Sequence, residues 1–275
     1  MNTLKLLIRT SRPSWWFFIP SIFLAGSLFV NLELSWIFFL QVFLLSFPYS
    51  LFMFGINDIY DHDSDIINPR KKRLGGIRHE RSDYVVIKRY VLLSGLLLLV
   101  SSLITLNYIN IIGMVSLLFV TYYYSAPPLR FKSRPVIDSL SNGLSFFLVF
   151  LMIISFSTEF FIPKNIYFLS LLIAVLHSFY SIPDYSSDKA VGHKTISVLL
   201  GKRVAAFFSF IISLLILLFV HFNHVIILYV LAFYTFLFFL GFINPKEKFV
   251  SFLFWVIFFS TIILVFSFFL VNLLS

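Results

Sequence analysis

Residues 36–65 read WIFFLQVFLLSFPYSLFMFGINDIYDHDSD, an uncharged apolar run that ends in a group of acidic side chains. A helix that spans a bilayer needs about 20 mainly apolar residues. Residues 36–56 meet that requirement, so we predict a membrane-spanning helix there. The acidic residues then lie at the end of this helix, where the chain leaves the apolar layer.

The composition of the whole chain agrees with a membrane protein. Of its 275 residues 60% are hydrophobic and only 12% are charged, about half of the ~25% that is usual in soluble domains. This excludes an ordinary soluble globule, a disordered chain and a disulfide scaffold. The lack of cysteine excludes a thiolate nucleophile and cysteine-ligated zinc. The lipid bilayer is an expected partner, and the net charge of +9 requires no nucleic acid to explain it.

Apolar runs long enough to cross the membrane recur along the sequence. They cover residues 15–31, 36–56, 84–106, 109–126, 136–156, 165–183, 204–221, 223–241 and 249–272. We therefore expect an all-α, polytopic membrane protein with nine transmembrane helices, folded as a single domain over residues 1–275. Residues 1–12 lack a small-residue cleavage site and predict a short interfacial helix rather than a cleaved signal.

The basic residues are distributed unequally between the two sides of this arrangement. Nine helices place all but one of the 21 Lys and Arg residues on the same side, and only Lys164 on the other. Because cytoplasmic loops carry the excess of Lys and Arg, we expect a multi-pass protein of the cell membrane with a cytoplasmic amino terminus and an external carboxyl terminus. The long polar connections, residues 57–83, 127–135 and 184–203, would then face the cytoplasm and contain the active site.

Two groups of acidic side chains end predicted helices on that face. The first group shares one helical stripe and consists of Asn57, Asp58, Asp61 and Asp65. In the second group, Asp184 and Asp188 are again one helical turn apart. Stacked carboxylates repel one another and are costly near a membrane, so each group requires a neutralising partner. We interpret the two groups as facing walls of one cavity.

Paired carboxylates favour a hard cation, and Mg²⁺ fills its remaining positions with water and substrate phosphate. Nearby basic residues are candidates for binding the phosphate: Arg70, Arg130, Lys132, Lys189 and Lys194. Ion pairing within a solvated loop would explain one acidic group, but two matched groups favour a metal site. An EF-hand is excluded because Ile66 and Lys72 replace its required Gly and Glu. No GxxxxGK[ST] phosphate loop is present, which argues against an ATPase.

These residues resemble the UbiA-type intramembrane prenyltransferase family. Its first signature, NDxxDxxxD, matches the first acidic group in full. Its second signature is a DxxxD followed by a basic residue and G-x-[KR]-T, which matches residues 184–195. Members also carry a Tyr followed by basic residues, as in residues 124–132.

The resemblance implies a fold, an activity and a set of roles. Members of the family are nine-helix bundles around a central cavity, and each acidic signature binds Mg²⁺ and the diphosphate of an isoprenoid donor. Carried over to this chain, the metal ligands are Asn57, Asp58, Asp61, Asp65, Asp184 and Asp188, and the catalytic residues are Asp61, Asp184 and Tyr124. The implied activity is Mg²⁺-dependent transfer of a prenyl group to a hydrophobic acceptor.

The strings around these motifs look most like the lycopene elongase-type carotenoid prenyltransferases, which add a C5 unit from dimethylallyl diphosphate to a C40 polyene. Three alternatives stay open. They are a prenyltransferase with an aromatic, quinone-precursor acceptor, a membrane terpene cyclase and, in a different class, a cation transporter. Charges that gather at one face rather than at the midplane argue against the transporter.

Five further polar residues are candidates for the acceptor side: Arg12, Asp138, Asn142, His177 and Tyr180. Arg12, at the mouth of the first span, is the one basic candidate for holding an anionic acceptor. If the acceptor is an apolar polyene, we expect Arg12→Ala to cost little. His177 shares a helical face with Asp184. It is either the base that removes a proton after bond formation or a buried histidine satisfied by a neighbouring helix.

Overall fold

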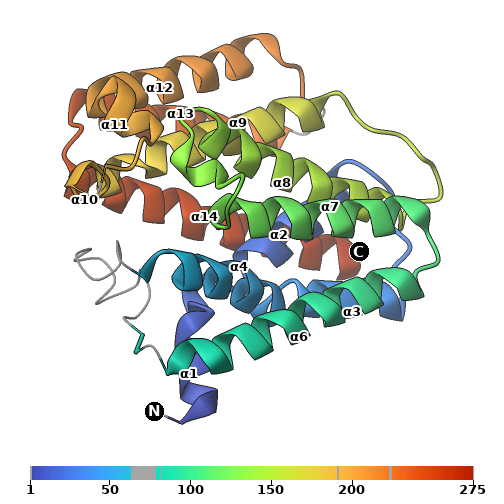
Figure 1. The fold of residues 1–275 in the computed structure, drawn as a ribbon. Coiled ribbons are helices and arrows are strands. Elements are labelled where there is room, and N and C mark those ends of the chain that lie inside the picture. Colours follow the sequence, from blue (N-terminus) through green and yellow to red (C-terminus); the bar gives the residue numbers. More distant parts are fainter. Residues whose placement is uncertain (1, 63–78, 81, 191, 223–224, 275) are drawn as a thin grey trace. The chain divides into compact units, whose positions relative to one another are not determined.

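The computed structural model of the chain describes residues 2–62, 79–80, 82–190, 192–222 and 225–274. Within those residues all regular structure is helical (Figure 1), and the β-bridge between Leu32 and Ser157 is isolated. The chain divides into two compact units, which we describe one at a time. The first comprises Met1–Arg130, Leu148–Phe161 and Leu264–Ser275, and the second comprises Phe131–Phe147 and Ile162–Ile263.

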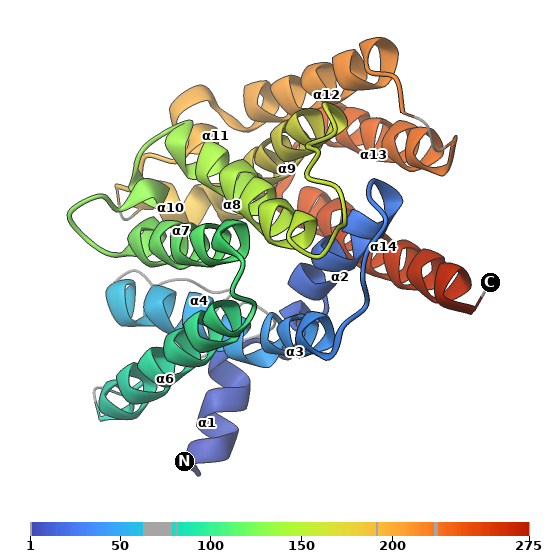
Figure 2. The same ribbon diagram turned by 90° about the vertical axis from the view of Figure 1, so that its right-hand side faces the viewer.

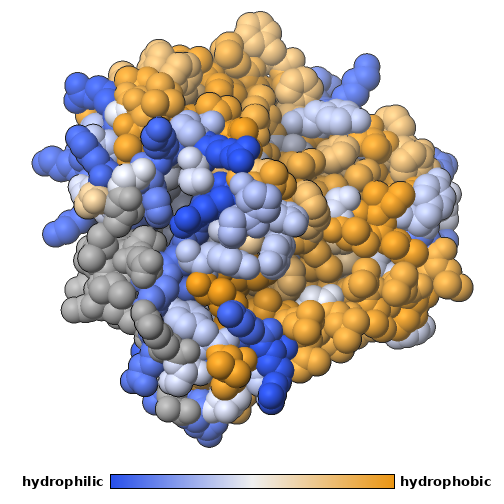
Figure 3. Space-filling view, viewed as in Figure 1, coloured by the Kyte–Doolittle hydropathy of each residue, from blue (hydrophilic) through white to orange (hydrophobic). Residues whose placement is uncertain are grey.

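Eight helices within the described residues are long and apolar enough to cross a membrane. Their bounds are Trp36–Tyr60, Asp83–Ile104, Tyr108–Ser125, Ile137–Ile154, Asn165–Ala190, Lys202–Phe219, Val225–Ile243 and Glu247–Val271. They correspond to eight of the nine expected spans and agree with the expected all-α, polytopic class. Apolar side chains form a large continuous area of the surface in view in Figure 3, as expected of helices that meet lipid, and hydrophilic residues gather beside it.

The expected first span, residues 15–31, is not one long helix. It is divided among η1 (Pro13–Trp15), α2 (Phe18–Leu24) and η2 (Ala25–Leu28). Pro20 lies in the first turn of α2, where a proline is tolerated but prevents the helix from extending further back. In η2, Gly26 approaches the Ile153 side chain so closely that a Cβ would collide with it. A hydropathy pattern predicts neither the start of α2 just before Pro20 nor the contact between Gly26 and Ile153.

In the first unit, α3 (Trp36–Leu44) and α4 (Phe47–Tyr60) form the span that carries the first acidic motif. A short turn separates them. Pro48 follows in the first turn of α4, where its missing N–H leaves no intrahelical hydrogen bond unmade. The helix ends directly before Asp61. The acidic motif therefore begins at a helix carboxyl end, as the sequence predicted.

α4 is fixed by close packing against α6 (Asp83–Ile104), which lies alongside it in Figures 1 and 2. Gly55 of α4 lies against Val91 so closely that a Cβ would collide with the valine side chain. A buried cluster joins α1 (Thr3–Thr10) to this pair. It consists of Leu6, Phe52, Ile56, Ile87 and Val91. Apolar packing thus holds the carboxyl half of α4 and the motif that follows it.

Asn110 of α7 (Tyr108–Ser125) forms a buried polar network elsewhere in the first unit. Its Oδ1 accepts from Gln41 Nε2 at 2.8 Å and from Ser102 Oγ at 2.6 Å. Its Nδ2 donates to Gln41 Oε1 at 3.0 Å and to Ser155 Oγ at 2.8 Å. These bonds tie α3, α6 and α7 together and satisfy polar groups that lipid cannot.

The second unit contains the start of α8 (Ile137–Ile154), α9 (Asn165–Tyr180), α12 (Lys202–Phe219), α13 (Val225–Ile243) and most of α14 (Glu247–Leu274). The short η4 (Phe131–Ser133) precedes α8, and η5 (Ile182–Asp184), α10 (Tyr185–Ala190) and α11 (Ile196–Leu200) lie between α9 and α12. A Cβ on Gly143 would lie 2.5 Å from the Ser170 carbonyl oxygen, so α8 and α9 approach closely. The second acidic motif lies on η5 and α10.

Candidate active site

Asn57 and Asp61 form the centre of the first acidic motif. The Asp61 backbone N–H donates to the Asn57 carbonyl oxygen at 3.0 Å, which completes the last helical turn. The Asn57 side-chain nitrogen donates to Asp61 Oδ2 at 2.7 Å and to Ser125 Oγ, at the end of α7, at 3.3 Å. The amide of Asn57 therefore orients the Asp61 carboxylate, which is buried.

Arg130, predicted to bind diphosphate, lies beside this carboxylate. Its Nη2 is 3.3 Å from Asp61 Oδ1. Arg130 has a backbone φ of 39°, which side-chain-bearing residues rarely adopt. Tyr124 lies in the last turn of α7, next to Ser125. The structure thus brings Asn57, Asp61 and Arg130 together as predicted, while a catalytic role for Tyr124 stays a prediction.

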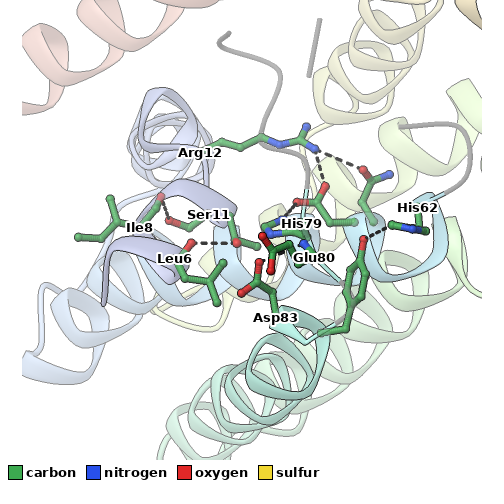
Figure 4. A network of polar contacts seen from close by, with 12 residues as sticks. Leu6, Ile8, Ser11, Arg12, His62, His79, Glu80 and Asp83 are labelled. Carbon is green, nitrogen blue, oxygen red and sulfur yellow. Dashed lines mark hydrogen bonds and ion pairs between the residues drawn. The ribbon is translucent and has the colours of Figure 1, made fainter. Parts of the chain in front are cut away.

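Asp58 faces a different set of partners. Its side chain has no exposed surface. Its Oδ1 accepts from Arg12 Nη2 at 3.0 Å and its Oδ2 from His79 Nε2 at 2.9 Å. Figure 4 shows Arg12 and His79 converging on the same group of side chains. Both oxygens of Asp58 are therefore engaged by donors from two other segments, and the side chain is fully buried. Its role as a metal ligand stays a prediction.

Sequence reasoning missed His79 and gave Arg12 a different role. Arg12 was a candidate for an anionic acceptor, but its guanidinium contacts the first acidic motif, including Asn57 Oδ1 at 3.3 Å. His79 is far from Asp58 in sequence, and no spacing relates the two residues. A fully buried carboxylate requires compensating donors, which is a reason to search for them but does not identify them.

The second motif is built on η5 and α10 in the second unit. Asp184 ends η5, and its carbonyl oxygen accepts from Ser187 Oγ at 2.9 Å. The Asp188 carbonyl oxygen accepts from the His193 backbone N–H at 2.9 Å, and His193 Nδ1 lies 3.5 Å from Asp188 Oδ1. The two predicted ligands thus lie on one short helical segment, and His193 is a partner that the sequence did not predict.

Glu247, another residue that the sequence did not predict, holds this segment in place. Its Oε1 accepts from Ser186 Oγ at 2.6 Å and from Lys202 Nζ at 3.2 Å. Lys202 Nζ also lies 5.0 Å from the centre of the Tyr185 ring. These contacts fasten α10 to the starts of α12 and α14.

The predicted diphosphate-binding cations are distributed over both units. Lys189 lies on α10, with its Nζ 5.6 Å from the Tyr185 ring centre, and Lys194 is exposed a few residues later. Lys132 lies in η4. Arg70, like the predicted metal ligand Asp65, lies outside the described residues.

Three of the acceptor-side candidates lie together in the second unit. Asn142 Nδ2 donates to the Asp138 carbonyl oxygen at 2.8 Å, so both belong to the first turns of α8. His177 Nδ1 lies 3.3 Å from Ser139 Oγ. His177 is partly buried, and Ser139 of the neighbouring helix α8 is a partner for its ring. Its role as a base stays a prediction. The Tyr180 ring is stacked on Phe254, with ring centres 3.9 Å apart.

The donor atoms of the two motifs fit a hard divalent cation. They are carboxylate and amide oxygens, which Mg²⁺ prefers. Among the described residues, no three His, Asp or Glu side chains converge as a ready-made metal cluster. Magnesium typically keeps water and substrate phosphate among its ligands, so a pair of protein oxygens at each motif is a sufficient protein contribution.

The fold and these motifs define a class of protein: a multi-pass, all-helical membrane protein with acidic motifs at the ends of two of its long helices. The profile of the UbiA prenyltransferase family matches residues 14–246, and the chain belongs to this family. The resemblance read from the motifs is thereby confirmed.

Several relatives of the chain share one name. The chain is 30% identical to "Lycopene elongase/hydratase" of Haloarcula japonica over 211 residues, 72% of this chain and 68% of that protein. It is 32% identical to the protein of the same name from Corynebacterium glutamicum over 146 residues, 53% of this chain. That match spans about half (51%) of the length of the Corynebacterium relative.

Solved structures show the same fold. A UbiA homolog from Archaeoglobus fulgidus, described as bound to GPP and Mg²⁺, aligns with a TM-score of 0.72 at 23% identity and covers 95% of this chain and 98% of that one. The apo structure of a UbiA homolog from Aeropyrum pernix K1 aligns with a TM-score of 0.69 at 17% identity, covering 94% and 97%.

Proposed function

We propose that this chain is a prenyltransferase that moves a prenyl group from an isoprenoid diphosphate to a hydrophobic acceptor, and that the acceptor is a carotenoid polyene. The main support is the arrangement at the end of α4, where the Asp61 carboxylate accepts hydrogen bonds from both Asn57 and Arg130. A carboxylate beside a guanidinium offers a ligand for a divalent cation and a donor for a phosphate oxygen at one place.

The comparisons support the donor, the metal and the acceptor class. Structures of the Archaeoglobus homolog are described as bound to GPP, to DMAPP, to Mg²⁺ and to Cd²⁺. These descriptions support an isoprenoid diphosphate donor and a divalent metal, for which we propose Mg²⁺. The relatives named lycopene elongase/hydratase support a carotenoid acceptor.

Each site residue has a role in the proposed reaction. Asn57 and Asp61 in the first motif, and Asp184 and Asp188 in the second, hold Mg²⁺, which when bound stabilises negative charge on the departing diphosphate. Basic side chains neutralise the diphosphate oxygens: Arg70, Arg130, Lys132, Lys189 and Lys194. The donor C–O bond breaks with its electron pair on the diphosphate, and a terminal alkene of the polyene attacks the prenyl carbon. The resulting cation then loses a proton or takes up water.

The helices favour an apolar acceptor over an anionic aromatic one. An acceptor carboxylate needs a cation to bind it, yet the Arg12 guanidinium donates to Asp58 and Asn57. Five of the long helices, α4, α7, α8, α9 and α13, contain no Lys or Arg. A polyene needs no such partner, because burial of its chain is worth about 0.8 kcal/mol per CH₂-sized unit.

The distribution of basic residues supports an orientation for this function. The amino terminus and the loops that carry the acidic motifs face the cytoplasm, where the water-soluble donor is available, and the carboxyl terminus faces outward. A reporter fused after Ser275 is expected to read as external, and one inserted within residues 74–80 as cytoplasmic. The opposite readings would contradict the orientation.

Pigment analysis in a lycopene-producing host tests the function. Expression of the chain should convert lycopene to C45 and C50 carotenoids, whereas the Asp61→Asn variant, expressed at the same level, should leave lycopene unchanged. Unaltered lycopene with the wild-type chain, together with prenylation of 4-hydroxybenzoate by the same membranes, would replace the carotenoid acceptor with an aromatic one.

A further inference from the structure

Asp58, Arg12 and His79 form a buried ionic group from three separate segments of the first unit. Asp58 lies in the last turn of α4, Arg12 precedes η1 and His79 comes shortly before α6. The exposed fractions of the three side chains are 0% for Asp58, 1% for His79 and 12% for Arg12. A carboxylate buried this deeply persists only with donors on its oxygens. Arg12 donates to one oxygen and His79 to the other. Figure 4 labels both donors.

Arg12 links this group to the residues that face the metal site. The same Nη2 that contacts Asp58 lies 3.3 Å from Asn57 Oδ1. An amide has one oxygen and one NH₂, so a cation at the oxygen directs the nitrogen to the other side. That nitrogen donates to Asp61 Oδ2 at 2.7 Å. Arg12 thus sets the orientation of the Asn57 amide and, through it, of the Asp61 carboxylate.

The backbone of Arg12 indicates that this placement is enforced. Its φ is 52°, in the left-handed region that residues other than glycine rarely adopt. Such a conformation persists when the surroundings over-determine it. Here the ion pair with Asp58 and a contact between the guanidinium and the Phe54 ring, 4.1 Å from Cζ to the ring centre, hold the side chain.

We propose that Arg12 and His79 are positioning residues of the first acidic motif, and that Asp58 is their buried anchor rather than a metal ligand. The inference rests on the proposed function, because it assigns metal binding to Asn57 and Asp61. His79 acts through Asp58 by holding the end of α4 in the orientation that Arg12 and Asn57 require. Loss of a group that orients a metal ligand typically weakens metal affinity about 10- to 100-fold.

The test measures metal binding by the purified full-length chain without any acceptor. Mn²⁺ serves as the probe, inorganic pyrophosphate is added, and free Mn²⁺ is read by electron paramagnetic resonance. His79→Leu should weaken Mn²⁺ affinity about tenfold or more. His79→Gln, whose side-chain nitrogen can still donate to Asp58, should stay close to wild type. Gln41→Leu is the matched control, because it removes a fully buried polar side chain of the same unit whose hydrogen bonds, among the described residues, go to Asn110.

Both Leu variants should unfold at a lower temperature, but only His79→Leu should alter Mn²⁺ affinity. In turnover, His79→Leu should raise the Mg²⁺ concentration for half-maximal rate and leave the KM for lycopene unchanged. Equal Mn²⁺ affinities of His79→Leu and wild type would overturn the proposal. So would a loss in Gln41→Leu as large as that in His79→Leu, or a failure of His79→Gln to restore binding.

The variants Asp58→Asn and Asp61→Asn test whether Asp58 is a buried anchor or a metal ligand. Asp58→Asn keeps an acceptor for Arg12, so it should weaken Mn²⁺ binding less than Asp61→Asn does. An equal loss in the two variants would make Asp58 a ligand and overturn its role as an anchor. Because Mn²⁺ binding needs no acceptor, this pattern can hold even if lycopene is not a substrate, in which case only the proposed acceptor fails. A wild-type chain that binds no Mn²⁺ would overturn the positioning proposal itself.

Discussion

The side-chain nitrogen of Asn57 lies 2.7 Å from Oδ2 of Asp61, one helical turn further along the chain, at the point where α4 ends. The other Asp61 oxygen lies 3.3 Å from Arg130 Nη2. The carboxylate is thus held on one side by a neutral donor and on the other by a cation. In the proposed function, this geometry places the metal ion held by Asp61 next to the side chain that binds phosphate.

Asp61→Asn is expected to lower turnover by about 10²- to 10³-fold, the usual effect of removing one electrostatic contributor to a transition state. The helical content and the unfolding temperature should remain close to wild type, because the amide fills the same volume. Turnover with Mg²⁺ and circular dichroism of the same preparation measure the two effects. Wild-type turnover in EDTA would contradict a metal-dependent mechanism, whereas loss that added Mg²⁺ reverses would support it.

Arg130→Gln should raise the KM for the isoprenoid diphosphate about tenfold, since one charge-assisted hydrogen bond of ~1.4 kcal/mol corresponds to that factor. The KM for the acceptor should not change. Arg130→Lys keeps the charge, so its KM for the isoprenoid diphosphate should lie between those of the wild type and Arg130→Gln. Initial rates with donor and acceptor varied separately provide the test, and an effect confined to the acceptor KM would assign Arg130 to the wrong substrate.

Arg12→Ala should be far more damaging than the sequence alone suggested. The substitution removes the ion pair of a fully buried carboxylate, and breaking a buried pair typically costs about 3–5 kcal/mol. Both the unfolding temperature and the turnover should fall in Arg12→Ala. In Arg12→Lys, which keeps the charge, both should fall less. A stable, fully active Arg12→Ala variant would show that Asp58 does not depend on this partner.

Asn110→Leu is expected to destabilise the protein by about 1–3 kcal/mol, because it leaves the buried polar atoms of Gln41, Ser102 and Ser155 without their shared partner. The Mg²⁺ concentration for half-maximal turnover should not change, since the bonds of this network do not reach the acidic side chains that the structure describes. Thermal unfolding in detergent measures the first effect. A shift in the Mg²⁺ requirement would contradict a purely structural role.

Glu247→Leu should reduce turnover while hardly affecting stability. The ion pair between Glu247 and Lys202 is partly exposed, and such pairs contribute about 0–1 kcal/mol. The same carboxylate, however, holds Ser186 on the helix that carries Asp188. Glu247→Gln keeps an acceptor for Ser186 and should restore most of the rate. Equal rates in the Leu and Gln variants would show that the Ser186 contact does not matter.

The long helices were predictable because each is a run of apolar residues of membrane-spanning length. The first expected span, 15–31, is different because local constraints divide it. Pro20 fixes where α2 begins, and Gly26 allows an approach to Ile153 that no hydropathy pattern contains. Such contacts depend on residues far apart in the sequence.

Helical spacing also predicted the part of the site that lies on one element. Asn57 and Asp61 are one turn apart, and that spacing alone places their side chains together. The contacts of Asp58 with Arg12 and His79, and of Glu247 with Ser186, join different segments. No periodicity relates these partners, so only the folded chain reveals them.

Product analysis with the purified chain in lipid nanodiscs, supplied with Mg²⁺, dimethylallyl diphosphate and lycopene, tests whether the chain prenylates a carotenoid. Chromatography with mass detection should show C45 and then C50 carotenoids, with diphosphate released in step with each added unit, and no product from 4-hydroxybenzoate. Lycopene left unchanged while 4-hydroxybenzoate or a dihydroxynaphthoate is prenylated would contradict the carotenoid assignment.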